Sequence, residues 1–247
     1  MIEGVVDMRD AYRDARVAKQ YVDERFREPL GALLHSRQAA AMRRTVLETD
    51  PRHVVEIAPG PARLTTEVAP LLRRPPVIVD ASAEMLEQAE ARLAAIHREA
   101  IVVNGDAFDL PFDGQFDLAY TFRLIRHFGR ADRMRLYREI HRVLRPGGVL
   151  VFDVVNAVTS APLRDKDASG EYRHYDALLG RDELVGELRD AGFEIVQLEG
   201  VQHRYRLMQV VQVYVAPRSR MLARAIMELL DRSGGEPLEW IVTCRRG

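Results

Sequence analysis

Apolar residues in the middle of the chain occur in short runs, and stretches with helical spacing lie between several of them. The β-branched run Val54, Val55 and Ile57 predicts a strand, and residues 62–72 place Leu and Val side chains along one helical face. Further strands are predicted at residues 77–80, 101–104, 116–120 and 149–152. Helices are expected from residue 83 onward and over residues 132–144. Strands and helices in this order indicate an α/β domain built on a largely parallel sheet.

Two further segments flank this core. Residues 9–48 have helical spacing that is interrupted at Pro29, Leu30 and Gly31, so we expect a helical cap over residues 1–50. The main domain is expected over residues 51–247. It is predicted to include a helix over residues 181–190, strands over 194–198 and 240–244, and a long insertion over 203–237.

The insertion contains one amphipathic segment, residues 221–230, with six apolar side chains on one side. This face could form a homodimer contact or a lid, or it could pack on the domain's own sheet. The sequence leaves these alternatives open.

Composition limits the classes of partner. The 247 residues have a formal net charge of −1 and are 47% hydrophobic, so bulk charge predicts no attraction to nucleic acid or membrane. A single cysteine, Cys244, excludes an internal disulfide and suits a reducing compartment. No apolar stretch approaches the length of a membrane span, and the first residues lack the pattern of a signal peptide. The histidines show no i, i+4 pair. We therefore expect a cytoplasmic protein without a metal.

The turn after the first predicted strand narrows the type of ligand. Gly60 lies between Pro59 and Pro61, and each proline removes a backbone N–H that a phosphate would need. An adenosyl ligand without phosphates would require only a close backbone approach at Gly60 and a carboxylate for its amino group. Glu56, near the end of the strand, is placed to supply that carboxylate. The same prolines argue against an NAD-dependent oxidoreductase.

Acidic residues also follow the next two predicted strands. Asp80 lies about 20 residues past the turn, the position from which open α/β sheets bind ribose hydroxyls. Ser82 is the expected N-cap of the next helix, and Met85 in its first turn could lie against an adenine. Asp106 follows the third strand, so carboxylates mark the ends of three successive strands.

These residues carry a family resemblance. Residues 55–65, 79–86, 105–112, 116–118 and 144–148 resemble, in order, the motifs of class I S-adenosylmethionine-dependent methyltransferases, and most closely the small-molecule branch that includes ubiquinone/menaquinone methyltransferase-like enzymes. The resemblance implies a doubly wound, Rossmann-like sheet of seven strands, the last antiparallel. It implies S-adenosyl-L-methionine as cofactor and S-adenosyl-L-homocysteine as product.

The resemblance also implies roles for individual residues. Glu56 would contact the methionine amino group, Asp80 the ribose and Asp106 the adenine amino group, with a backbone contact from Ala107. The full set of expected cofactor-binding residues is Glu56, Ala58, Pro59, Gly60, Asp80, Ala81, Met85, Asp106, Ala107 and Thr121.

The turn departs from the family pattern, because Ala58 and Ala62 stand where two of three glycines are usual. Alanine disfavours positive φ, so the turn is tolerable if both residues have ordinary dihedral angles. Reduced cofactor affinity is an alternative outcome. The same feature supports a catalytically silent binding or assembly subunit. The three retained carboxylates, Glu56, Asp80 and Asp106, argue against that alternative. An enzyme that uses the cofactor for non-methyl chemistry is a further alternative.

The methyl acceptor is expected beyond the fourth strand. His127 is the candidate general base because its unperturbed pKa lies near neutrality, although a structural role is an alternative. Arg123 and Arg126, three residues apart, could bind an acidic small molecule or pair with Asp109, Asp113 or Asp132. Other candidate substrate-binding residues are Tyr21, Arg25 and Tyr172.

Overall fold

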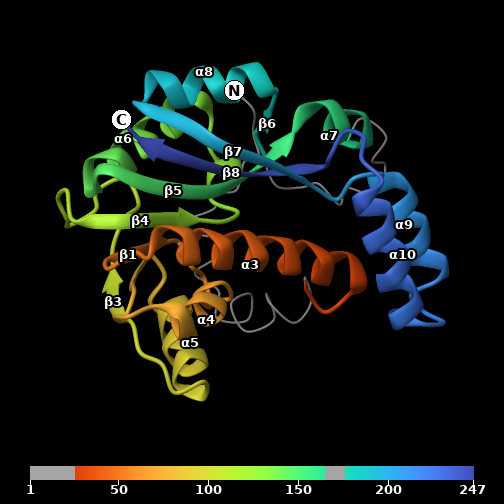
Figure 1. Cartoon of the computed structure of the whole chain (residues 1–247), viewed down its shortest axis with the longest axis horizontal. Coiled ribbons are helices and arrows are strands. Elements are labelled where there is room, and N and C mark those ends of the chain that lie inside the picture. The colour runs from red at the N-terminus through yellow and green to blue at the C-terminus, as the bar shows by residue number, and fades with distance from the viewer. Residues whose placement is uncertain (1–25, 165–175) are drawn as a thin grey trace, which may run out of the picture.

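The molecule is built around one mixed sheet (Figure 1). The computed structural model describes residues 26–164 and 176–247, and all numbers of strands and helices refer to these residues. Seven strands lie in the order β3-β2-β1-β4-β5-β8-β7, and β6 pairs with β5 off this path. The strands are β1 Val54–Ile57, β2 Val77–Asp80, β3 Ile101–Asn104, β4 Phe116–Thr121, β5 Leu144–Asn156, β6 Leu178–Leu179, β7 Phe193–Val201 and β8 Glu239–Arg246.

Strand direction agrees with the predicted fold class. Strands β1 to β6 pair in parallel, whereas β8 is antiparallel to both β5 and β7. The eighth strand, β6, is the one addition to the seven expected, and only two of its residues pair with β5. Because the parallel strands end at the same edge, the residues after β1, β2, β3, β4 and β5 lie along one carboxyl edge, where such sheets bind ligands.

Helices cover both faces of the sheet. They are α3 Pro29–Thr49, α4 Thr65–Val68, α5 Ala83–Ala95, α6 Arg130–Val143, α7 Ala157–Arg164, α8 Arg181–Asp190, α9 Tyr205–Tyr214 and α10 Arg220–Arg232, with short 3₁₀ turns η1 Ala69–Leu71 and η2 Ile125–His127. Figure 1 shows α8 on one side of the sheet and α3 on the other. Val55 and Ile57 pack in the core that includes α6 and α8, whereas Val54 packs in the core that includes α3. This alternation follows from the two-residue period of a strand.

The interruption expected at Pro29, Leu30 and Gly31 lies just before them, because residues 27–28 form a bend and α3 begins at Pro29. The proline is the first residue of the helix, where its missing N–H costs nothing and its fixed φ suits the helical conformation. Leu33 and Met42 are buried along the helix. The part of the predicted cap before residue 26 lies outside the described residues.

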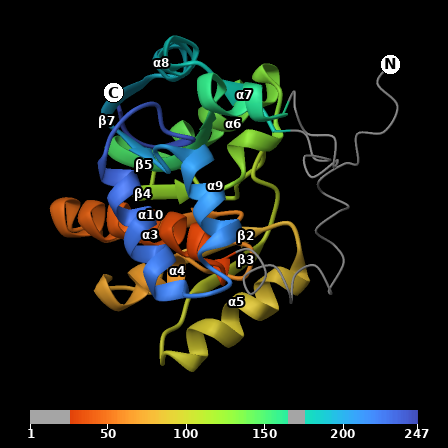
Figure 2. The ribbon, with the colours of Figure 1, turned by 90° about the vertical axis from the view of Figure 1, so that its right-hand side faces the viewer.

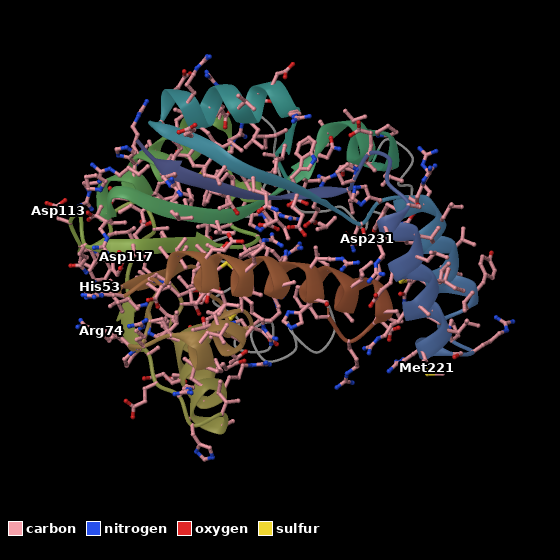
Figure 3. All side chains as sticks on the ribbon, viewed as in Figure 1. His53, Arg74, Asp113, Asp117, Met221 and Asp231 are labelled. Carbon is pink, nitrogen blue, oxygen red and sulfur yellow. The ribbon has the colours of Figure 1, made fainter. Side chains whose placement is uncertain are left out.

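The connection between β7 and β8 contains α9 and α10, which run side by side next to α3 (Figure 2). Their shared core contains Leu33, Met208 and Met227, so α10 packs on α3 and α9 rather than on the sheet. Asp231 lies where α10 meets α3, and its carboxylate accepts a 2.7 Å hydrogen bond from Arg37 (Figure 3). Met221 at the other end of α10 is 83% exposed.

One predicted helix is shorter in the structure than expected. The predicted helix over residues 62–72 is shortened to α4 and the 3₁₀ turn η1, and Leu71 is exposed instead of packed. Pro70 lacks the N–H that a continuing α-helix would need.

Within residues 26–164 and 176–247, no helix is both long and apolar enough to cross a membrane.

Candidate functional site

The turn after β1 holds three residues in the left-handed region. Ala58, Gly60 and Ala62 have φ values of 52°, 55° and 55°. The condition that both alanines have ordinary dihedral angles is therefore not met. The backbone keeps the path that glycine would favour, at a cost of about 1–2 kcal/mol for each alanine. Ala62 is fully buried, and the Ala58 N–H donates a 2.8 Å hydrogen bond to the carbonyl of Val79 on β2.

Asp80 connects this turn to the start of α5. Its Oδ2 accepts a 3.0 Å hydrogen bond from the Gly60 N–H, and its Oδ1 accepts a 2.9 Å bond from the Ser82 N–H. Burial raises the pKa of the Asp80 carboxyl, although these backbone donors oppose the shift. A Cβ placed on Gly60 would lie 3.9 Å from the Sδ of Met85, so the thioether sits beside the turn. Ser82 caps α5 as predicted, since its Oγ accepts from the Met85 N–H.

Glu56 is a buried carboxylate at the same edge. Its Oε2 accepts a short hydrogen bond from the Thr65 hydroxyl, and the residue is only 2% exposed. Burial raises the pKa of Glu56 to about 7, although the Thr65 hydroxyl opposes the shift. A carboxylate in this state gains stability from any cation brought next to it, because a nearby positive charge favours the ionised form.

The remaining predicted cofactor residues differ in exposure. Asp106 is exposed, and its Oδ1 accepts a 3.0 Å hydrogen bond from the Phe108 N–H, which closes the turn after β3. Ala81 is exposed and Ala107 is half-buried. Thr121, at the end of β4, is fully buried, and its hydroxyl has no hydrogen-bond partner in the described part of the chain. Pro59 is buried within the turn.

The donor set at this turn fits a nucleoside ligand that carries a positive charge and no phosphate. Glu56 supplies a buried negative charge, and Asp80 retains lone pairs for hydroxyl groups because each oxygen accepts one backbone bond. Two of the turn's residues are prolines, which offer no N–H to a phosphate.

The segment after β4 is fixed by a buried network of charges. Asp153 on β5 accepts 2.5 Å hydrogen bonds from the Arg123 backbone N–H and from the Arg126 guanidinium. Glu239 at the start of β8 accepts a 3.0 Å bond from Arg126. Burial alone would lower the pKa of the Arg126 guanidinium, but Glu239 and Asp153 raise it well above its ordinary value.

The contacts of Arg126 differ from both expectations, which were an acidic small molecule or an ion pair with a surface aspartate. Its side chain is 2% exposed and is enclosed by Asp153 and Glu239, so it is not placed to bind an acidic small molecule. It also does not pair with Asp109, Asp113 or Asp132. The sequence shows that Asp153 lies inside an apolar strand, where a buried carboxylate needs a compensating cation, but it does not identify which cation that is.

Arg123 differs from Arg126 in conformation and in contacts. Its φ is 66°, a value that costs a non-glycine residue about 1–3 kcal/mol unless the surroundings enforce it. Among the described residues its side chain has no ion pair or hydrogen bond, and its Nε is buried. The Asp153 carboxylate holds only the backbone N–H. The Arg123 side chain is therefore half-buried, and its guanidinium N–H groups have no acceptor among the described residues.

His127 ends the 3₁₀ turn η2 and contacts an acidic residue that sequence reasoning missed. The Nδ1 of His127 lies 3.5 Å from Oδ1 of Asp176, which precedes β6. The other carboxylate oxygen of Asp176 accepts a 2.8 Å hydrogen bond from Arg164 at the end of α7. Asp176 belongs to no sequence motif and is far from His127 in the sequence. Only the fold brings the two residues together, so no local signal could have identified Asp176.

Three predicted substrate-binding residues, Tyr21, Arg25 and Tyr172, lie outside the described residues. Within the ranges that are described, no group of three or more His, Cys, Asp or Glu side chains could hold a metal ion.

Similarity to known proteins agrees with this geometry. The family described as "Methyltransferase domain" matches residues 54–148. A probable S-adenosylmethionine-dependent methyltransferase of Mycobacterium tuberculosis is 33% identical over 122 residues, which cover 49% of this chain and 43% of the relative. The 27-O-demethylrifamycin SV methyltransferase of Amycolatopsis mediterranei is 29% identical over 134 residues, covering 52% of this chain and 48% of the relative.

A solved structure extends the similarity to almost the whole chain. The magnesium protoporphyrin IX methyltransferase of Synechocystis, crystallised with bound SAH, aligns with a TM-score of 0.69 at 10% identity and covers 97% of this chain and 98% of its own. This likeness shows the fold alone. The chain spans less than half the length of either relative compared by sequence.

Proposed function

We propose, on the premise that this chain belongs to the class I S-adenosylmethionine-dependent methyltransferases, that it transfers a methyl group to a small molecule bearing an acidic group. The observation that carries the acidic class of acceptor is Arg123. Its backbone is held in a strained conformation at the carboxyl edge by Asp153, and its guanidinium has no partner of its own among the described residues. A guanidinium forms paired hydrogen bonds to carboxylate or phosphate, which explains why such a conformation would be maintained.

The cofactor of the family is S-adenosylmethionine, which supplies an activated methyl group and a neutral thioether leaving group. In this chain Glu56 would hold its ammonium group and Asp80 its ribose hydroxyls. Met85 would contact the adenine from beside Gly60, and Asp106 and Ala107 would meet its edge. When bound, the cofactor would supply its methyl group to the nucleophilic atom of the acceptor, and the electron pair of the broken carbon–sulfur bond would remain on the sulfur.

His127 would receive the proton that the acceptor loses. It lies at the end of η2, after β4, with Arg123 four positions earlier, so an acceptor held by Arg123 through its acidic group would present its nucleophile on the same segment. Positioning of this kind contributes much of the rate in a direct displacement. The name of the Amycolatopsis relative, a methyltransferase of a rifamycin, supports a small molecule as acceptor class.

The first experiment is calorimetric titration of the purified protein with S-adenosylmethionine, S-adenosylhomocysteine and NAD in parallel. Binding of the two adenosyl ligands, and not of NAD, is the expected result. Failure of both adenosyl ligands to bind would contradict the proposed cofactor and favour a silent subunit.

The second experiment tests the acidic acceptor. Methyl transfer is assayed with a panel of hydroxybenzoic acids and amino acids, each matched with its neutral amide. We expect Arg123→Ala to raise KM for the acid by about 10-fold or more, the scale of a lost charge-assisted hydrogen bond, and to leave the amide unaffected. Arg224→Ala, at an exposed position on α10, is the matched control. Equal KM values for acid and amide in the unaltered enzyme would overturn the acidic class.

A further inference from the structure

The outer side of helices α9 and α10 carries an apolar surface. Of the fourteen large hydrophobic side chains that are exposed in the described part of the chain, half lie between residues 207 and 229. We call these seven the hairpin surface, and each is between 52% and 83% exposed: Leu207, Val210, Val213, Tyr214, Met221, Leu222 and Leu229. Single exposed apolar side chains are ordinary on a protein, whereas a group of them marks an interaction surface.

The side chains of the hairpin surface form a stripe along each helix. In α9, Leu207, Val210 and Tyr214 follow one another at intervals of three and four residues, so they share one helical face. In α10, Leu222 and Leu229 are two turns apart and also share a face. The opposite side of each helix packs in the core shared with α3. Both stripes therefore face away from α3, on two helices that lie side by side (Figure 2).

The two helices are attached to α3 by contacts on their inner side. Arg37 of α3 donates a 2.7 Å hydrogen bond to Asp231 near the end of α10. The backbone N–H of Leu30 donates a 3.1 Å hydrogen bond to the side-chain carbonyl of Gln212 on α9. The hairpin surface is therefore carried by elements that the fold already holds in place, so no ordering of these helices is needed before a partner binds.

Positive charge is concentrated in the same part of the chain. Residues 204–232 contain six arginines and two acidic residues, a formal charge of +4, whereas the whole chain has −1. One of the two acidic residues, Asp231, is buried and already has an arginine partner on α3. Arg206 in α9, Arg218 between the helices and Arg232 at the end of α10 are all exposed. The net charge of the chain thus conceals a local region that attracts anions.

An anionic lipid surface matches this combination better than a second copy of the chain does. Two copies that met through the same face would bring two positively charged surfaces together, which opposes association. Apolar stripes on helices that are rich in arginine are instead typical of helices that lie in a membrane interface. The apolar side chains would enter the acyl boundary, while the long arginine side chains reach the lipid phosphates.

We propose that the hairpin surface binds a membrane that contains anionic phospholipids, with α9 and α10 lying along the bilayer surface. The sequence-based expectation of no membrane attraction rested on net charge, which averages over the whole chain. The local charge of residues 204–232 has the opposite sign. Lipid binding of this kind is separate from the proposed methyl transfer and does not depend on it.

The test is flotation of the full-length protein with vesicles of phosphatidylcholine alone or of phosphatidylcholine mixed with phosphatidylglycerol. We expect binding to the anionic vesicles only, and weaker binding as the salt concentration rises. The double variant Met221→Ser/Leu229→Ser should lower the partition coefficient by about 10-fold or more, because less apolar area enters the bilayer. Arg206→Gln/Arg218→Gln should also lower it by about 10-fold or more, because two charges near the lipid phosphates are lost.

Matched control variants carry the same substitutions elsewhere on the surface. Val185→Ser/Val196→Ser changes two exposed apolar side chains, one on α8 and one on β7. Arg181→Gln/Arg189→Gln removes two exposed arginines from α8. Both controls should bind anionic vesicles as the unaltered protein does. Thermal unfolding verifies that each variant is folded.

Failure of the unaltered protein to bind anionic vesicles would overturn the proposal. Equal binding to neutral vesicles would also overturn it, and so would binding that both hairpin variants retain. Sedimentation velocity without lipid distinguishes the other occupants when vesicles do not bind. A dimer that Met221→Ser/Leu229→Ser dissociates would assign the surface to a second copy, whereas a monomer would leave an acidic protein as the partner to seek.

Discussion

The carboxyl edge of the sheet has two parts that are built in different ways. The half that we propose binds the cofactor, called the cofactor half, lies where β1, β2 and β3 end and is shaped mainly by the backbone, with three positive φ values and N–H groups that donate to Asp80. The half that we propose binds the acceptor, called the acceptor half, lies where β4 and β5 end and is shaped by buried side-chain charges, with Arg126 between Asp153 and Glu239.

The difference shows which sequence changes each half tolerates. A backbone-built turn accepts alanine for glycine provided that the surrounding contacts enforce the dihedral angle, because one methyl group is added and no hydrogen bond is lost. A network of buried charges has no such tolerance, because removing one member leaves its partners ionised without compensation. Mutations should therefore have their largest effects on stability in the acceptor half.

The largest effect is expected for Arg126→Ala. Breaking a buried ion pair by removing one partner costs about 3–5 kcal/mol, and here two carboxylates would be left unpaired. Urea unfolding of the free protein measures the loss. The matched control is Arg123→Ala, whose side chain has no partner among the described residues and which should change stability by less than about 0.5 kcal/mol. Similar losses of unfolding free energy in Arg126→Ala and Arg123→Ala would contradict the expected difference between the two arginines.

Glu56→Gln should stabilise the free protein at alkaline pH. The pKa of Glu56 is about 7 in the folded protein against an ordinary value of 4.5, so the folded state binds more protons between these pH values. Stability from this group therefore falls as pH rises through that window, by an amount on the order of 1–3 kcal/mol. Because Glu56→Gln has no charge at this position, it should restore the stability that is lost as pH rises.

Urea unfolding of Glu56→Gln and the unaltered protein at pH 5 and pH 8 measures this prediction. The variant should gain stability relative to the unaltered protein mainly at pH 8. The same variant should bind S-adenosylmethionine more weakly, because it lacks a charge for the ammonium group. A gain that is equal at both pH values would show that Glu56 is ionised throughout.

Asp80→Ala should weaken binding of S-adenosylhomocysteine by about 1–3 kcal/mol, the scale of a hydrogen-bonding partner removed from a shielded site. Calorimetric titration gives the change. Asp106→Ala is the comparison, and its loss should be smaller because Asp106 is exposed and water replaces its contacts. Unchanged affinity in Asp80→Ala would remove Asp80 from the binding site.

The smallest effect is expected for Ala58→Gly and Ala62→Gly. Each relieves a left-handed alanine but gives the unfolded chain more freedom, so the net gain should be no more than about 1 kcal/mol per site. Thermal unfolding measures it. Ala89→Gly, a buried position inside α5, should instead lose stability. A loss at Ala58 and Ala62 comparable to the loss at Ala89 would mean that the methyl groups contribute packing that outweighs the strain.

Much of the cofactor half could be predicted because its signals are local. Strand β1, the turn at Gly60 and the capping of α5 by Ser82 each depend on residues within a few positions of one another. Spacing along the chain also placed Asp80 at the end of β2. The positive φ of Ala58 and Ala62 could not be predicted in this way, because alanine by itself disfavours that conformation and only the contacts around the turn enforce it.

What the sequence by itself determined is the order of strands and helices and the position of the binding turn, since short-range periodicity and capping decide both. The tertiary structure alone decided the partners of the buried charges and the packing of α10 on α3. Arg126 and Glu239 are 113 positions apart, and no local pattern relates them. Their pairing follows from the antiparallel return of β8 beside β5, which brings a second carboxylate to the edge where Asp153 already lies and excludes water from all three side chains.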